Sequence, residues 1–316
     1  MLSMRLSLTF FGAALAVALV ASPAAAREDW FEPASLGMGG AVRILGGDIA
    51  AVRLNPATMV GTPTYYVGVG YIYFGREKSH VFSTGAYDSK TSAFGLGSSY
   101  SINIYTPVVD PASDLNWYVP DEAVEDRHTT HRWEIAVAYG LLERRINFGL
   151  SARVLRHVNA LKPNSLRFTI DTGIVFRPIP ILGIGVSAQN LFPTKDERFP
   201  TRLSGGVALA LPKLLDVGVD AVIDFTSQDT IRVDVHAGAA VRIAQVILVR
   251  AGYYGDRGFK DNYVTWGLGL EISADRSFGI DYGMRIEVGP IDARLRADRK
   301  EGFQRIVNSI GVHMGF

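Results

Sequence analysis

The residues best suited to chemistry form one acidic stretch that ends in two histidines. His128 and His131 lie three residues apart in the sequence HTTH. They follow a group of carboxylates at Asp121, Glu122, Glu125 and Asp126. Carboxylate and imidazole groups at this density could hold a metal or calcium ion. Because the stretch lacks the ligand spacing of an EF-hand, we favour the alternative of a solvated polar loop and predict no metal site.

No other group of residues has the spacing of a catalytic site. The sequence GLSAR at 149–153 lacks the second glycine of a nucleophile elbow. The glycine-rich stretches at 37–40 and 267–271 are not followed by a helical pattern, which argues against a phosphate-binding loop. The chain contains no cysteine, so thiolate chemistry and disulfides are excluded. We therefore expect a protein that is not an enzyme and that uses no cofactor.

The N-terminus has the pattern of a secretory signal peptide. Arg5 precedes an apolar run at 6–21, and small residues follow at 24–26. We predict that residues 1–26 are removed after export; a transmembrane anchor is the alternative, but the apolar run is short for one. Of the 32 Lys and Arg residues, one lies within 1–26, so 31 remain against 31 Asp and Glu. This balance predicts no nucleic-acid partner.

Beyond residue 63, apolar and polar residues alternate along most of the chain. In FGIDYGMRIEV at 278–288, every second residue is large and apolar. A period of two is typical of a β-strand. We predict about fourteen strands, at residues 64–75, 80–88, 92–105, 131–140, 145–158, 166–177, 181–192, 201–211, 214–225, 229–243, 245–254, 262–273, 276–288 and 304–316. Many exceed the about five or six residues of an ordinary strand and match the about nine to eleven of a membrane-crossing strand.

The connections between these strands fall into two groups. If Phe316 lies at the periplasmic side, the turns on that side are all short, and several loops on the other side are long and polar. No apolar run after residue 26 is long enough for a transmembrane helix, so insertion in a membrane would require a closed barrel. Short inner turns, longer outer loops and an even strand number are typical of outer-membrane barrels. We predict an all-β fold, a transmembrane antiparallel β-barrel; a soluble periplasmic sandwich is the alternative.

Charged residues recur on the strand face opposite to the bulky apolar residues. An arginine or lysine that faces lipid at mid-strand costs about 2–4 kcal/mol, so the charged face should line the lumen. Both signs occur, which favours a network of ion pairs over an ion-selective ring. The predicted lumenal polar network consists of Arg153, Arg167, Asp171, Asp220, Arg232, Asp234, His236, Asp281 and Arg285. The same alternation places further charges on this face, at Arg132, Glu134, Asp216, Asp224 and Glu287.

The sequence SLGMGGAVRILGGDIAAVRLNPATM at 35–59 resembles the N-terminal signature of the FadL and PorV/PorQ superfamily of outer-membrane barrels. The matching residues are Gly37, Met38, Gly39, Gly40, Ala41, Asp48, Ala50, Ala51, Asn55, Pro56 and Ala57. The stretches at 188–209 and 249–270 also resemble barrels of the PorV type. The resemblance implies a fourteen-strand barrel at 64–316 with residues 27–63 as a plug or hatch in its lumen; a disordered leader is the alternative.

The plug is expected to depend on a few residues with special backbone properties. Glycine lets a backbone approach the wall closely, and an Asn-Pro pair favours a turn. Asp48 could pair with a lumenal arginine. The predicted plug residues are Gly39, Gly40, Asp48, Asn55 and Pro56, and their expected lumenal partners are Arg153, Arg232 and Asp281.

By its resemblance to FadL, the protein is expected to pass small hydrophobic molecules across the outer membrane of a Gram-negative-type bacterium, through a lateral gap in the wall. The Gly205-Gly206 pair could kink a strand to open such a gap. The alternative is a PorV/PorQ-like component of a protein secretion or surface-attachment system that transports no small molecules.

The expected partners follow from these two interpretations. They are outer-membrane lipid and lipopolysaccharide, a hydrophobic small-molecule ligand and, on the alternative, secretion-system proteins. A basic cluster in the last outer loop could contact lipopolysaccharide phosphates, or could be simply solvated. The residues of this cluster are Arg294, Arg296, Arg299 and Lys300.

Overall fold

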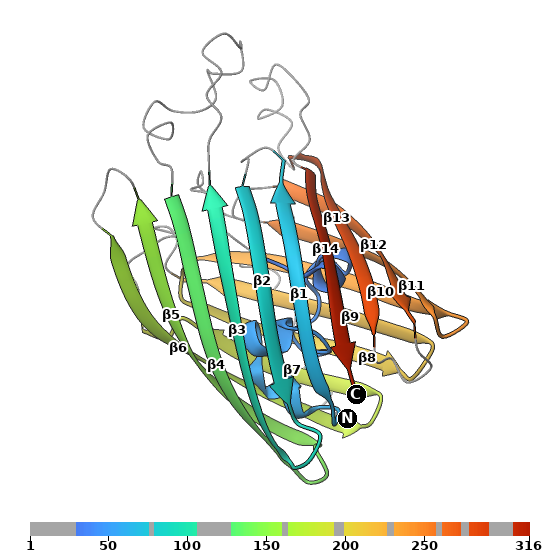
Figure 1. The fold of residues 1–316 in the computed structure, drawn as a ribbon. Coiled ribbons are helices and arrows are strands. Elements are labelled where there is room, and N and C mark those ends of the chain that lie inside the picture. The colour runs from blue at the N-terminus through green and yellow to red at the C-terminus, as the bar shows by residue number, and fades with distance from the viewer. Residues whose placement is uncertain are drawn as a thin grey trace, which may run out of the picture.

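The computed structural model contains fourteen β-strands, one for each run predicted from the sequence (Figure 1). The strands are β1 (Tyr65–Phe74), β2 (Ser79–Asp88), β3 (Phe94–Tyr105), β4 (His128–Leu141), β5 (Ile146–Asn159), β6 (Ser165–Ile179), β7 (Leu182–Gln189), β8 (Arg202–Leu211), β9 (Leu215–Asp224), β10 (Arg232–Ile243), β11 (Ile247–Asp256), β12 (Asp261–Glu271), β13 (Gly279–Pro290) and β14 (Ile306–Gly315). The structure describes residues 30–75, 79–105, 128–159, 164–192, 199–225, 231–256, 261–272, 278–290 and 306–316.

The strands form one closed antiparallel barrel. Each strand pairs with its neighbours in sequence, and β1 closes the sheet by pairing with β14 from Tyr66↔Gly315 to Phe74↔Val307. A closed sheet satisfies the backbone hydrogen bonds of its strands internally, as the hydrocarbon core of a membrane requires. The predicted transmembrane antiparallel barrel is confirmed.

Bulky apolar side chains cover the outside of the barrel, and polar side chains fill its inside. In β5, Asn147, Ser151 and Arg153 are buried, whereas Phe148 and Leu150 are exposed. A soluble sandwich would press its apolar faces against each other to form a core. The prediction of a lumenal charged face is met along this strand, and the soluble alternative is wrong.

Residues 30–63 lie inside the barrel, and we call them the internal segment (blue in Figure 1). They form the short helices α2 (Pro33–Gly37) and α3 (Ala50–Arg53) and the 3-10 helix η2 (Pro56–Val60). The helix α2 packs against β11 to β14, and η2 packs against β3 to β6, so the internal segment crosses the lumen. No helix in the described part of the chain is long and apolar enough to cross a membrane.

At one end of the barrel, short turns connect neighbouring strands, and we call this the short-turn end. The chain terminates there, where Phe316 exchanges backbone hydrogen bonds with Tyr65 (Figure 1). The tight turns force residues into the left-handed region, as at Glu143 between β4 and β5 (φ 56°) and Lys213 between β8 and β9 (φ 64°). Such conformations are typical of tight β-hairpins.

Two ladders of the described wall shift register, β6–β7 and β12–β13. The β6–β7 ladder shifts register near the end of β6, and β7 ends at Gln189. By contrast, the ladders at Gly205 and Gly206 continue without a shift on both sides of β8. The sheet is therefore continuous at this glycine pair, and no gap opens there. A Cβ at Gly206 would collide with the Asp220 carboxylate, so this glycine makes room for a lumenal side chain.

Candidate functional site

Glu134 of β4 is the centre of a buried group of charges in the lumen. Its carboxylate lies 2.6 Å from Arg153 Nε, 3.2 Å from Arg132 Nε and 3.4 Å from Arg53 Nε. It also accepts a hydrogen bond of 2.6 Å from Ser99 Oγ. Because Glu134 is only 2 % exposed, its charge is compensated by protein groups rather than by water.

Two more carboxylates complete this group. Glu32 lies 2.5 Å from Arg53 Nη1, and Asp171 lies 2.5 Å from Arg153 Nη2. The group, which we call the ionic cluster, consists of Glu32, Arg53, Arg132, Glu134, Arg153 and Asp171. Acidic and basic members are equal in number, as a group of buried charges without solvent requires.

The ionic cluster joins the internal segment to the barrel wall. Arg53 is the last residue of α3, and its Nε also donates to Ser99 Oγ of β3 at 3.3 Å. The Arg53 carbonyl accepts hydrogen bonds from Arg153 Nη2 of β5 at 3.1 Å and from Gln189 Nε2 of β7 at 2.9 Å. One residue of the internal segment thus contacts β3, β4, β5 and β7.

Gly39 and Gly40 bring the internal segment close to β10 and β11. Their φ angles are +65° and +80°. A Cβ at Gly39 would lie 2.6 Å from the carbonyl oxygen of Tyr253, and one at Gly40 would lie 2.8 Å from His236 Nδ1. The same His236 nitrogen forms a 2.7 Å hydrogen bond with the Gly39 carbonyl. Both glycines are needed here because a side chain would meet the wall and the backbone is left-handed.

Asn55 and Pro56 begin the 3-10 helix η2. Asn55 Oδ1 accepts a hydrogen bond from the Ala57 backbone N–H at 3.2 Å, and Pro56 occupies the first helical position. Asn55 Nδ2 donates to the Arg43 carbonyl at 2.8 Å, which ties two parts of the internal segment together. The pair therefore makes the turn that its sequence predicts.

Asp48 has a different environment from the one predicted. Its carboxylate accepts hydrogen bonds from Ser35 Oγ and from the Ala50 backbone N–H, both at 2.7 Å. Burial raises the pKa of Asp48 to about 6. The expected pair between Asp48 and a lumenal arginine is wrong, because this carboxylate binds the start of α3 instead.

The three expected lumenal partners of the plug differ in their contacts. Asp281 of β13 pairs with Arg250 Nη1 at 2.7 Å and with His313 Nδ1 at 3.0 Å, and both of these residues belong to the wall. Arg232 is buried at the first position of β10. Arg153 contacts the internal segment directly, because its Nη2 donates to the carbonyl at the end of α3.

The remaining predicted lumenal residues occupy several levels of the wall. Asp220 accepts a 3.0 Å hydrogen bond from the Arg43 backbone N–H. Asp234 is fully buried. The Arg285 guanidinium lies 4.8 Å from the centre of the Tyr263 ring. These groups are lumenal, but they do not belong to the ionic cluster.

Arg167 is the exception among the predicted lumenal residues. It is exposed, as are its neighbours Leu166 and Phe168. This end of β6 extends beyond the part that pairs with β7, which begins at Thr172. Arg167 has the same parity as the buried Thr169 and Asp171, so it lies on the predicted lumenal face of β6, but alternation does not give how deeply a residue is buried there.

The two histidines of the HTTH sequence do not converge. His128 stacks on Tyr105 with ring centres 4.9 Å apart. His131 stacks on Trp133 at 5.5 Å and hydrogen-bonds Tyr100 Oη at 2.8 Å. The four carboxylates that precede them, the basic cluster at 294–300 and the signal sequence at 1–26 lie outside the described residues.

Sequence reasoning missed three residues of this site: Glu32, Arg53 and Asn190. Asn190 has a φ of +56° and follows the last residue of β7. Its backbone N–H donates to Asp171 Oδ1 and its Oδ1 accepts from Arg153 Nη1, both at 2.7 Å. Arg53 carried a signal that could have been used, since a charge in an apolar internal segment needs a partner on the wall.

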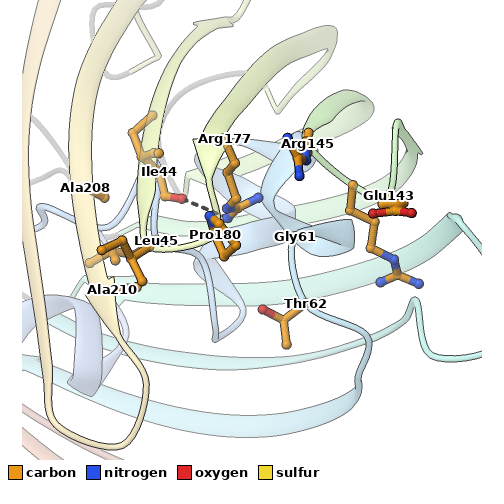
Figure 2. A pocket seen from close by; sticks show the side chains of 13 residues that line it. Ile44, Leu45, Gly61, Thr62, Glu143, Arg145, Arg177, Pro180, Ala208 and Ala210 are labelled. Atoms are coloured by element: carbon orange, nitrogen blue, oxygen red, sulfur yellow. Dashed lines mark hydrogen bonds between the residues drawn. The ribbon is translucent and has the colours of Figure 1, made fainter.

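A cleft of about 260 Å³ opens at the short-turn end (Figure 2). Leu45 of the internal segment and Ala208 of β8 contribute apolar surface, and the β4–β5 turn contributes Arg145. Figure 2 shows Arg177 reaching into the same space, where its Nη2 donates to the Ile44 carbonyl at 3.4 Å. The cleft thus lies between the internal segment, the wall and two turns.

Comparison with known proteins identifies the fold. No family model and no curated protein matches the sequence. The Ralstonia pickettii toluene transporter TbuX matches with a TM-score of 0.65 and 13 % identity over 90 % of this chain and 98 % of that chain. The monoaromatic hydrocarbon channel CymD matches at 0.62 with 12 % identity over 90 % and 97 %. A Pseudomonas aeruginosa FadL homologue matches at 0.58 with 12 % identity over 92 % and 98 %.

The chain shares the barrel fold of these three proteins. At these identities the likeness concerns the architecture alone, and the side chains must be interpreted on their own. The matches cover nearly the full length of each neighbour. Nothing in them bears on the PorV/PorQ part of the resemblance. The roles of the ionic cluster and of the cleft therefore follow from the side chains of this protein and not from the likeness in fold.

Proposed function

We propose that this FadL-type barrel passes small hydrophobic molecules across the outer membrane. The fold is shared with proteins named as a toluene transporter and a monoaromatic hydrocarbon channel. The observation that carries the proposal is how the lumen is filled. A single segment, residues 30–63, occupies it and is held to the wall through side-chain contacts such as those of Arg53. In this proposal, the internal segment is a plug that shifts to let cargo pass.

The site supports transport better than chemistry. Its charges are neutralised in pairs, and its aromatic rings are packed against each other, as in the stack of His236 on Tyr254 at 4.6 Å. We place the short-turn end in the periplasm, as in other outer-membrane barrels, and the signal peptide at 1–26 would direct export.

The wall at the end of β7 is the proposed lateral exit or entrance. β7 stops at Gln189, and Asn190 then accepts a hydrogen bond from Arg153 with its side-chain Oδ1 and donates one to Asp171 from its backbone N–H. The ionic cluster therefore connects the internal segment to the end of β7. A shift of the internal segment would change the contacts of Asn190 through Arg153.

A disulfide that fixes the internal segment tests the proposal. Leu36 Cβ in α2 lies 3.2 Å from the position of a Cβ at Gly283 in β13, near the separation of about 3.5–4.5 Å in disulfides. The same Cβ would collide with the Pro33 carbonyl oxygen, so the Gly283→Cys single variant is needed as the uncrosslinked reference. The chain has no other cysteine to interfere. In cells without other such transporters, the oxidised L36C/G283C variant should take up radiolabelled toluene at the rate of cells without the barrel. Reduction should restore uptake to the rate of the Gly283→Cys single variant.

The control is a disulfide within the wall. Ser89 Cβ lies 3.4 Å from a Cβ at Gly95, and both residues belong to the β2–β3 hairpin. The oxidised S89C/G95C variant should transport toluene normally. Uptake that continues while L36C/G283C is fully oxidised would contradict the movable plug, and wild-type uptake no higher than in cells without the barrel would contradict transport itself. The PorV/PorQ-like secretion role remains a hypothesis.

A further inference from the structure

The cleft at the short-turn end has an apolar floor of limited size (Figure 2). The floor is formed by Leu45, Ile181, Ala208 and Ala210. Its volume of about 260 Å³ is below the about 300–1,000 Å³ of pockets for drug-sized ligands. At about 30 Å³ per water-sized group, it holds about nine such groups. The cleft therefore fits the body of a single-ring molecule rather than a long chain.

Arginines outnumber carboxylates at the edge of this cleft. Arg144, Arg145 and Arg177 line it, together with the single carboxylate Glu143. Arg144 donates to three backbone carbonyls, and Arg177 donates to one. In the part of the chain that the structure describes, none of the three arginines forms an ion pair with a carboxylate. Among the described residues, the edge of the cleft thus carries a net positive charge.

Arg177 is the arginine at the cleft that keeps a buried donor without an acceptor among the described residues. Its guanidinium packs on Gly61, where a Cβ would lie 2.5 Å from both terminal nitrogens. Arg177 Nη1 is buried and has no hydrogen-bond acceptor among the described residues. A buried cation with an unused donor is stabilised by an anion at its side. Gly61 therefore provides the space that keeps this guanidinium at the edge of the cleft.

We propose that the cleft binds a small organic carboxylate with a ring-sized apolar body. The carboxylate accepts hydrogen bonds from the Arg177 guanidinium, whose planar fork matches a carboxylate. The apolar body lies on Leu45, Ile181 and Ala208. This proposal rests on the proposed function, because the cleft would be the last binding site that cargo meets before the periplasm. Such a site would favour acidic aromatic cargo over neutral hydrocarbon.

Binding to the purified full-length barrel in detergent tests the site. Benzoate combines the anion with the ring, acetate has only the anion, and benzyl alcohol has only the ring. Isothermal titration should give benzoate an affinity at least about tenfold higher than either of the others. Arg177→Gln should weaken benzoate binding by about tenfold or more, and Ala210→Phe, which fills the floor, should weaken it by a similar factor.

A matched control removes a guanidinium at the same end of the barrel but outside the cleft. Arg242 pairs with Asp216 at 2.9 Å, and Arg242→Gln should leave benzoate affinity unchanged. Heat-modifiable electrophoretic mobility confirms that each variant is folded. Benzoate binding no tighter than acetate binding, or unchanged in both Arg177→Gln and Ala210→Phe, would overturn the site.

The outcome separates this site from the transport proposal. If cells take up toluene but the purified barrel does not bind benzoate, the site is overturned and transport remains supported. Benzoate binding without cellular uptake of either compound would overturn the transport route, and with it the role of the cleft as a station. Uptake of both compounds, with benzoate uptake alone reduced by Arg177→Gln, is the expected result.

Discussion

Arg53 of the internal segment lies 3.4 Å from Glu134 of β4, measured from Nε to Oε2, and both side chains are at most 2 % exposed. Two buried charges from distant parts of the sequence thus meet at one point in the lumen. Breaking a buried ion pair leaves an uncompensated charge, whereas moving both partners into water does not. The pair therefore holds the internal segment against β4.

Glu134→Gln should destabilise the folded barrel by about 3–5 kcal/mol, because it removes the carboxylate shared by three buried arginines. The free energy of unfolding in urea, measured in detergent micelles, gives this value. Asp216→Asn is the matched control, since Asp216 pairs with Arg242 and is less buried. That variant should lose less, because water reaches part of the Asp216–Arg242 pair. Equal losses in the two variants would show that Glu134 does not organise the lumen.

Arg53→Met should loosen the internal segment without opening the barrel. The substitution keeps an apolar stem but removes the contacts to Glu32 and Glu134. Amide hydrogen exchange at 48–60 should accelerate by at least about tenfold, while exchange in β9 to β11 stays unchanged. Arg242→Gln serves as the control, because Arg242 of β10 pairs with Asp216, which is itself a residue of the wall. Unchanged exchange at 48–60 in Arg53→Met would contradict the role of Arg53 as an anchor.

The barrel was predictable from the sequence because the pattern of a strand is local. In β5, the alternation of apolar and polar residues predicts both the strand itself and the position of Arg153 on its lumenal face. The end of β7 was not predictable in this way, since the expected run continued to 192. Asn190 leaves the ladder to bind Arg153 and Asp171, and those partners come from two other strands. A tertiary contact overrides the local pattern there.

Gly39→Ala should be more damaging than Gly47→Ala, although both glycines have positive φ angles of +65° and +103°. A Cβ at Gly39 would lie 2.6 Å from the Tyr253 carbonyl oxygen, whereas nothing lies within 4 Å of one at Gly47. Gly47→Ala isolates the backbone strain, of about 1–3 kcal/mol. Gly39→Ala adds the collision with β11, so its loss of unfolding free energy should be the larger. Equal losses would mean that the internal segment does not press on the wall at Gly39.

The site was only partly predictable because side-chain partners depend on three-dimensional neighbours. The glycines and Asn55-Pro56 have intrinsic backbone preferences, so their positions in turns and close approaches follow from residue type. A carboxylate has no such preference. From its sequence, Asp48 could either pair with an arginine or bind the start of a helix. It does the second because Ser35 Oγ and the Ala50 backbone N–H lie next to its carboxylate in the fold. Arg167 shows the same limit, because its exposure depends on how far β7 extends.

Asp48 should make the barrel less stable as the pH rises from about 4 to 7. Its pKa is about 6 in the folded protein, against the ordinary value of 3.8 in the unfolded chain. The folded state therefore binds more protons between these values, and stability falls as the carboxyl ionises, by about 3 kcal/mol in total. Asp48→Asn cannot ionise, so the difference in unfolding free energy between wild type and this variant should change by that amount across the interval. Ser35→Ala removes the hydrogen bond from Ser35 that lowers the Asp48 pKa, so it should extend the fall to higher pH. A difference between wild type and Asp48→Asn that stays constant from pH 4 to 7 would show that Asp48 is not buried in the folded barrel.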